Sequence, residues 1–320
     1  MAPKSLDAIL ATALNYHQDP TTPNQQRAIV APCQLRINHK IILANQTQLY
    51  VLRLNREPLN TIRVHANAFE SKKVVATDNM GSQILFLAQF HNLEDDNPVV
   101  NALRQVVKDL HLMGKNRYPI KPATMLSGTM KGIGFRPGME HDKTAAFENN
   151  AALMKTFGLP SWSDSEWTDF LNDSTRAFTS AIVTNNDFTN EPHPDDDVNG
   201  FTYGIFTDIN PKTGDPITPN ISESSSGHAL RFPEFNCKID FGMSPGIIEI
   251  AWASNRVIHH TTKPPKSLQT TKFLTHFGSS LQTAKALIDR AQMLAELPLE
   301  RKLKQQLDAV KETELKIVGC

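Results

Sequence analysis

Cysteine is scarce in this sequence, which has Cys33, Cys237 and Cys320 among 320 residues. Their odd number and wide spacing argue against a disulfide framework and match no zinc motif. An excess of charge is also absent, because Lys+Arg and Asp+Glu are both 33. Any contact with nucleic acid would therefore have to come from a local basic patch.

Long apolar runs are missing as well. No stretch approaches the length of a membrane span, and the N-terminus lacks the apolar core of a signal peptide. We therefore expect a monomeric intracellular protein, nuclear or cytoplasmic, that does not enter a membrane. No compact basic cluster separates the two locations.

The first third of the chain alternates between strand and helix signals. Short aliphatic runs between residues 35 and 87, separated by Asn- and Gly-containing turns, predict a small meander of strands. Asn97 before Pro98 then marks a helix start, and a buried stripe from Val99 to Leu110 continues it until Gly114.

The remainder predicts helices on both sides of an all-β region. Helical patterns cover residues 144–157, the segment after the capping box at Ser163–Glu166, and the chain beyond Leu281. Between residues 180 and 280, short strands separated by turns are typical of a jelly roll. These strands are expected at residues 201–206, 229–232, 237–239 and 247–252.

We therefore predict an α+β protein with a double-stranded β-helix (jelly-roll) core, flanking helices and an N-terminal strand meander packed on the core. The expected division is an N-terminal α/β extension over residues 1–120, the β-helix over 121–295 and a charged helix over 296–320.

Residues 115–143 are basic and rich in glycine. This composition fits two readings, a solvated surface loop or a rim that contacts substrate. Under the second reading, Lys131, Arg136 and Lys143 are the candidate substrate-binding residues.

A His-x-Asp pair supplies the main chemical signal. On an extended strand, His193 and Asp195 point to the same face and could bind one metal ion. Two imidazoles and one carboxylate form the facial set of a non-haem Fe(II) centre. The third ligand is expected from the neighbouring pair His259 and His260, which face opposite ways on a strand, and His259 is preferred. The alternative is that His193 and its aspartates form a hydrophilic loop.

Several segments carry a family resemblance: Lys131–Gly138, Asn185–Asp195, Gly200–Gly204, Gly227–Pro233, Pro245–Trp252, His259–Thr261 and Thr275–Gln282. Together they resemble the Tet/JBP-like 2-oxoglutarate- and Fe(II)-dependent dioxygenases, and especially the expanded Tet-like family of basidiomycete fungi.

The resemblance implies that His193, Asp195 and His259 bind Fe(II), that 2-oxoglutarate is the cosubstrate, and that dioxygen is consumed with release of succinate and CO2. It also implies hydroxylation of a methylated base in DNA, with the base flipped out of the duplex. Two alternatives stay open: an oxygenase of a small molecule or protein side chain, and a diverged, inactive β-helix that serves as a binding module.

The chain departs from the family pattern at one position. The family has an arginine near the closing strand for the far carboxylate of 2-oxoglutarate, because a guanidinium binds a carboxylate bidentately. No arginine lies between Arg256 and Arg290 here. The candidates to replace it are Lys272, His276 and Arg231.

Overall fold

The computed structural model describes residues 37–42, 48–56, 60–66, 73–134, 180–220, 225–283 and 285. Most of the helices predicted at residues 144–157, after Ser163, beyond Leu281 and over 296–320 lie outside these ranges, as do Arg136 and Lys143. No helix in the described part is long and apolar enough to cross a membrane.

Two sheets form the fold, one of eleven strands and one of four. The larger has the order β1-β2-β4-β5-β13-β9-β15-β8-β7-β6, with β10 beside β9, and the smaller has the order β14-β11-β12-β3. The strands of the larger sheet are β1 (Ile37–Ile42), β2 (Gln48–Leu54), β4 (Lys73–Asp78), β5 (Ile84–His91), β6 (Pro119–Ile120), β7 (Met125–Gly134), β8 (Ser180–Asn190), β9 (Thr202–Ile209), β10 (Pro216–Ile217), β13 (Ile247–Trp252) and β15 (Thr275–Gln282). Those of the smaller sheet are β3 (Ile62–Val64), β11 (Ala229–Phe232), β12 (Cys237–Asp240) and β14 (His260–Thr261).

The two sheets face each other across an apolar core, as a double-stranded β-helix requires. Phe206 and Trp252 of the larger sheet belong to one buried cluster with Leu230, Phe232 and Ile239 of the smaller one. The predicted jelly-roll core is therefore confirmed. The strands expected at 229–232 and 247–252 have the bounds of β11 and β13.

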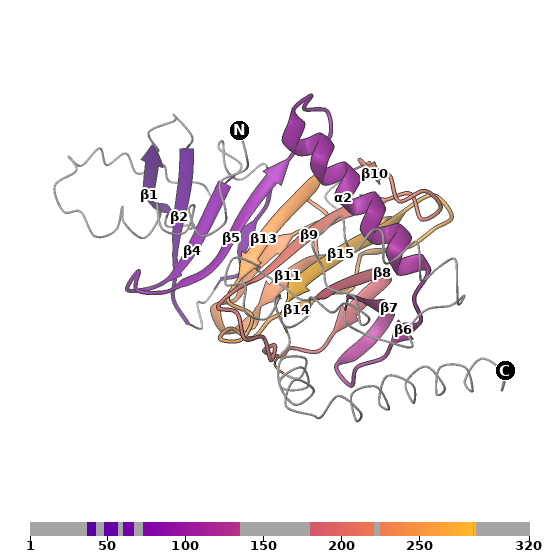
Figure 1. The fold of residues 1–320 in the computed structure, drawn as a ribbon. Coiled ribbons are helices and arrows are strands. Elements are labelled where there is room, and N and C mark those ends of the chain that lie inside the picture. The colour runs from indigo at the N-terminus through magenta and orange to yellow at the C-terminus, as the bar shows by residue number, and fades with distance from the viewer. Residues whose placement is uncertain are drawn as a thin grey trace, which may run out of the picture.

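The one described α-helix, α2 (Pro98–Lys115), crosses the outer face of the larger sheet (Figure 1). Asn97 caps it by accepting a hydrogen bond from the Val100 N–H, and Pro98 occupies the first turn, as predicted. Its apolar stripe packs against the face of β9 and β15 that points away from the core. The helix therefore covers this face. The helix continues one residue past Gly114.

The N-terminal strands extend the larger sheet (Figure 1). Strand β5 pairs antiparallel with β13, and β3 pairs parallel with β12 in the smaller sheet. Strands from both sides of the proposed boundary at residue 120 thus share both sheets. The boundary itself stays a prediction.

The described part of the basic segment 115–143 is a strand for much of its length, which corrects the expected loop. Strand β7 pairs with β8 over its whole length, with two irregularities. Gly128 has a φ of +86°, and a Cβ there would lie 2.3 Å from the Phe188 Cα. The glycine therefore permits close approach of two strands.

Candidate metal centre

Strand β8 carries the chain from the larger sheet toward the site. Asn186 and Asp187 have φ values of 56° and 59°, and the β7–β8 register shifts between Asn185 and Thr189, the interval that contains them. The Asp187 carboxylate accepts hydrogen bonds from the backbone N–H and the hydroxyl of Thr270, which stabilises this kink. A bulge of this kind bends a strand, and here it directs the chain toward His193.

Backbone pairing brings the two histidine segments together. His193 and His259 form an antiparallel bridge in which each N–H donates to the carbonyl of the other at 3.1 Å. The Asp195 N–H donates to the Ser254 carbonyl at 2.9 Å. The three residues come from two distant parts of the sequence, which main-chain hydrogen bonds therefore hold together.

The side chains of His193, Asp195 and His259 converge on one point. Their candidate ligand atoms all lie within 4.8 Å of one another. His193 Nε2 is 3.5 Å from Asp195 Oδ1, and His259 Nε2 is 3.6 Å from Asp195 Oδ2. Ligand atoms at about 2.1 Å from a metal and at right angles are about 3 Å apart, so a small contraction would suit a cation.

Both imidazoles are oriented by backbone carbonyls. His193 Nδ1 lies 2.7 Å from the Glu191 oxygen, and His259 Nδ1 lies 3.1 Å from the Val257 oxygen. A carbonyl only accepts, so each Nδ1 carries the proton and donates, and each Nε2 keeps a lone pair for a metal. This arrangement is typical of metal-binding histidines, and the donor set fits Fe(II).

The charge of Asp195 suits a cation. Burial alone would raise the pKa of its carboxyl group, but the neighbouring imidazoles of His193 and His259 hold that pKa well below its usual range. The Asp195 carboxylate raises the pKa of His193 in turn, against the effect of burial. The carboxylate is therefore ionised at neutral pH.

Asp197 has a structural part in the site. It is 6% exposed and accepts hydrogen bonds from the Asn199 and Thr283 N–H groups and the Thr202 hydroxyl, at 2.9, 3.1 and 2.8 Å. These contacts anchor the loop after Asp195 to β9 and to the end of β15.

His260 faces away from the three candidate ligands. It pairs with Arg231 across β14 and β11, on the opposite face from Thr261, which lines the cavity beside the site. Burial and the nearby Arg231 charge lower its pKa. The metal group among the described residues contains His259 and not His260.

A cavity of about 90 Å³ adjoins the three ligands and extends between the sheets. Phe206, Leu230 and Trp252 form part of its apolar wall, and Thr184, Ser280 and Gln282 contribute neutral polar groups. Among the residues that the structure describes, no lysine or arginine lines this cavity.

A buried polar cluster lies behind Phe206, whose ring stacks on that of His276 with centroids 6.4 Å apart. The His276 ring contacts His228 at 4.2 Å between centroids, and its Nδ1 is 3.5 Å from Asp208 Oδ1. Within the described chain, Asp208 Oδ1, His228 Nε2 and both His276 nitrogens have no hydrogen-bond partner. Such orphaned atoms mark a place for a water molecule or ligand.

Burial keeps this cluster uncharged. It lowers the pKa of His276 to about 3 and that of His228 well below its usual value, and it raises the pKa of Asp208 to about 7. The contact between His276 and Asp208 is therefore one between neutral groups below neutral pH.

We expect the stability of the metal-free protein to fall as the pH drops from 6.5 to about 4. In that range the unfolded histidines bind protons that the folded ones exclude, whereas Asp208 binds a proton only when folded. The unfolded state therefore binds two protons and the folded state one. This difference of one proton lowers the free energy of unfolding by about 1.4 kcal/mol for each pH unit.

Urea unfolding at several pH values measures this slope. The His276→Phe variant preserves the stacked rings but removes one titrating group, so it should lower the slope by about 1.4 kcal/mol per pH unit. An unchanged slope in that variant would contradict the pKa assignments.

The other predicted site residues lie apart from the three ligands. Lys272 is exposed, with its ammonium over the Phe273 ring. Arg231 occupies the strand face opposite to Leu230, which lines the cavity. Lys131 lies near the end of α2, where burial and the Lys115 charge lower its pKa. Only His276 of the cosubstrate candidates lies close behind the cavity wall.

The site agrees with the comparisons to known proteins. Residues 143–264, a range that includes all three ligands, match the model of the Tet-like 2OG-Fe(II) oxygenase superfamily. No curated protein matches the chain.

Three solved structures have weak similarity to the chain, each covering 62% of it. They are a Pseudomonas putida prolyl-4-hydroxylase (12% identity, TM-score 0.31, 92% of that chain), a 2OG-Fe(II) oxygenase family oxidoreductase from Burkholderia pseudomallei (11%, 0.31, 84%) and OsALKBH1 (12%, 0.33, 96%).

Proposed function

We propose that this enzyme, which carries a Tet-like 2OG-Fe(II) oxygenase domain over residues 143–264, hydroxylates a methyl group on a modified nucleobase of the 5-methylcytosine type. Fe(II) and 2-oxoglutarate are its cofactors, as for that superfamily. The observation that carries the proposal is the convergence of His193, Asp195 and His259 with both Nδ1 protons committed to carbonyls.

The chemistry comes from the bound cofactors: 2-oxoglutarate and dioxygen become succinate and CO2, with one oxygen atom entering the substrate C–H bond to form an alcohol. The two Nε2 atoms and the Asp195 carboxylate would hold Fe(II). The ionised carboxylate would offset part of the metal charge. The apolar rings of Phe206 and Trp252 keep water from the cavity.

For the far carboxylate of 2-oxoglutarate, we propose neutral donors in place of an arginine. Thr184 and Ser280 line the cavity, as does Trp252, whose Nε1 has no hydrogen-bond partner in the described part of the chain. His276 lies behind them on β15. Lys272 and Arg231 are less suitable, because one is exposed and the other faces away from the cavity.

No lysine or arginine among the described residues lines the cavity, which keeps the alternatives relevant. A cosubstrate held by neutral donors loses the roughly twofold stronger hydrogen bonds that a guanidinium provides. Weak binding of 2-oxoglutarate would favour an inactive binding module, and turnover without nucleic acid would favour a small-molecule or protein substrate.

A succinate assay tests the proposal. The protein is supplied with Fe(II), ascorbate and 2-oxoglutarate, with a methylated oligonucleotide, an unmethylated one or none. We expect succinate in excess of the background only with the methylated oligonucleotide, together with a hydroxylated base detected by mass spectrometry. Equal succinate in all three reactions, or none in any of them, would contradict a methylated base as the substrate.

A further inference from the structure

The outer face of the four-stranded sheet carries a row of basic side chains. Arg231 of β11 lies directly opposite His260 of β14 on one side and Lys238 of β12 on the other. Lys238 in turn lies opposite Arg63 of β3. One residue from each of the four strands thus forms a continuous row, which we call the basic row: His260, Arg231, Lys238 and Arg63.

All four residues point away from the core. Their neighbours along the strands, including Leu230, Phe232, Cys237, Ile239 and Val64, are buried in the apolar cluster between the sheets. Because side chains alternate along a strand, the basic row lies on the other face. Arg63 is exposed, and the other three are partly exposed.

Like charges placed directly opposite across strands destabilise a sheet, so this row needs compensation. Asp240, the one acidic residue in these four strands, gives only part of it. Its buried carboxylate is already engaged by the Lys238 ammonium at 3.1 Å, the Ser226 hydroxyl and the Met243 N–H.

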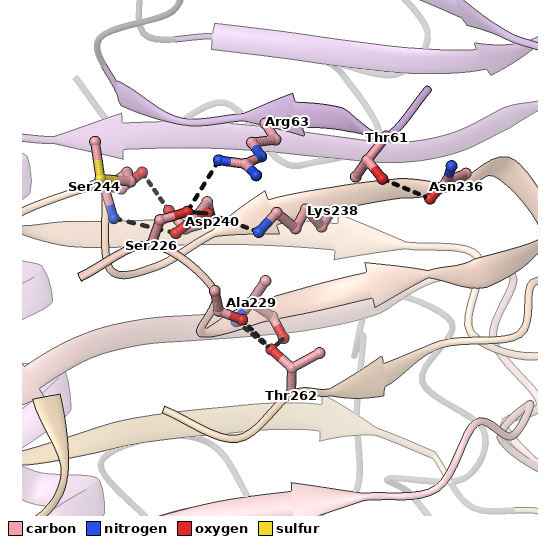
Figure 2. A network of polar contacts seen from close by, with 11 residues as sticks. Thr61, Arg63, Ser226, Ala229, Asn236, Lys238, Asp240, Ser244 and Thr262 are labelled. Carbon is pink, nitrogen blue, oxygen red and sulfur yellow. Dashed lines mark hydrogen bonds and ion pairs between the residues drawn. The ribbon is translucent and has the colours of Figure 1, made fainter. Parts of the chain in front are cut away.

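Figure 2 shows Lys238 reaching toward Asp240 and Arg63 toward Ser226, whose hydroxyl accepts from the Arg63 guanidinium at 3.1 Å. Among the described residues, no carboxylate contacts Arg63 or Arg231, and the Arg231 Nε has no hydrogen-bond partner. The charge of Arg231 also helps to lower the pKa of His260, and those of Arg63 and Lys238 help to lower the pKa of His65.

We propose that the basic row binds the phosphate backbone of a nucleic acid. Strands lie about 4.8 Å apart, so four of them span about 14 Å. One strand of a duplex places a phosphate about every 3.4 Å along the axis, which gives about four phosphates over this length. An anionic lipid surface fits less well, because insertion needs several exposed apolar side chains. Ala229 beside the row is buried, and Ile258, two residues before His260, is only 36% exposed.

This proposal deepens the proposed function, since it makes the substrate a base within a polymer that is held at a surface separate from the iron cavity. It also gives a near-neutral chain the local patch that nucleic-acid binding requires. Contacts to phosphates carry no sequence information, so the row should position the polymer without selecting the base.

Fluorescence anisotropy of a short labelled DNA duplex, titrated with the full chain at several salt concentrations, tests the row without turnover. Each phosphate contact contributes about 0.9 to the slope of log affinity against log salt. We expect Arg63→Gln and Arg231→Gln each to lower the slope by about one, and the double variant by about two. Arg231→Lys should restore most of it, and the exposed Lys212→Gln, on the β9–β10 turn, should leave it unchanged.

Three results would overturn the proposal: wild-type affinity in the double variant, an equal loss in Lys212→Gln, or binding to anionic vesicles with none to the duplex. Because Arg63 is exposed at the edge strand β3, its single variant should fold even if the double variant does not. If DNA binding depends on the basic row but no succinate forms, the proposed function fails and this inference stands. If succinate forms with methylated DNA but binding does not depend on the row, this inference fails and the proposed function stands.

Discussion

Asp195→Asn is expected to reduce succinate formation at least 100-fold while the protein remains folded. The amide has the shape of the carboxylate but no charge, and its NH2 group would point a donor at the metal position. The loss should exceed the 10- to 100-fold cost of removing a group that only orients a ligand. Succinate release with saturating Fe(II) and 2-oxoglutarate measures it.

The neighbouring Asp196→Asn is the matched control, because it makes the same chemical change one residue away. Asp196 is exposed, and only its backbone carbonyl has a described contact, with the Lys285 N–H. Its variant should retain the activity of the wild type. Comparable losses in both variants would indicate that the loop, and not the ligand, has been disturbed.

Asp197→Ala is expected to destabilise the protein by about 3 kcal/mol or more. The change leaves the Asn199 and Thr283 N–H groups without their acceptor, and each unsatisfied buried donor costs about 1–3 kcal/mol. Activity should fall as well, because the same contacts hold the chain two residues after Asp195. Urea denaturation of the metal-free protein measures the loss.

Asp197→Asn separates charge from hydrogen bonding. Its amide oxygen can still accept from both N–H groups, and the Thr202 hydroxyl can turn to its other partner, Ser254, at 2.6 Å. The expected cost is about 1 kcal/mol. A cost of less than about 1 kcal/mol for the alanine variant would show that water replaces the carboxylate and that the loop does not depend on it.

Local sequence patterns were sufficient for much of the core. Alternation and turn residues predicted β11 and β13 with the bounds observed, and the Asn97-Pro98 pair predicted the start of α2. These signals are local, because strand period and helix capping depend on residues a few positions apart. The same reasoning failed over residues 125–134, since the glycines that suggested a loop serve instead the close approach of β7 and β8.

The spacing of His193 and Asp195 correctly pointed to one shared face, but a sequence does not show what lies across from it. The bridge to His259 and the contact between Asp197 and Thr283 depend on long-range pairing. The carbonyls of Glu191 and Val257 lie only two residues from the imidazoles that they orient, but no pattern in the sequence indicates these contacts. The basic row was equally hidden, because its four residues lie far apart in sequence and meet only through strand register. The scattered basic residues of a neutral chain gave no signal of it.

The most direct test of the metal centre is pulsed electron paramagnetic resonance of the protein with Mn(II), a spin-active stand-in for Fe(II), under anaerobic conditions. If His193, Asp195 and His259 are the ligands, the spectrum should show two imidazole nitrogens coupled to the metal. The His259→Gln variant should show one coupled nitrogen, and the His260→Gln variant should still show two. No coupled nitrogen in the wild type, or loss of one in His260→Gln and not in His259→Gln, would contradict the assignment.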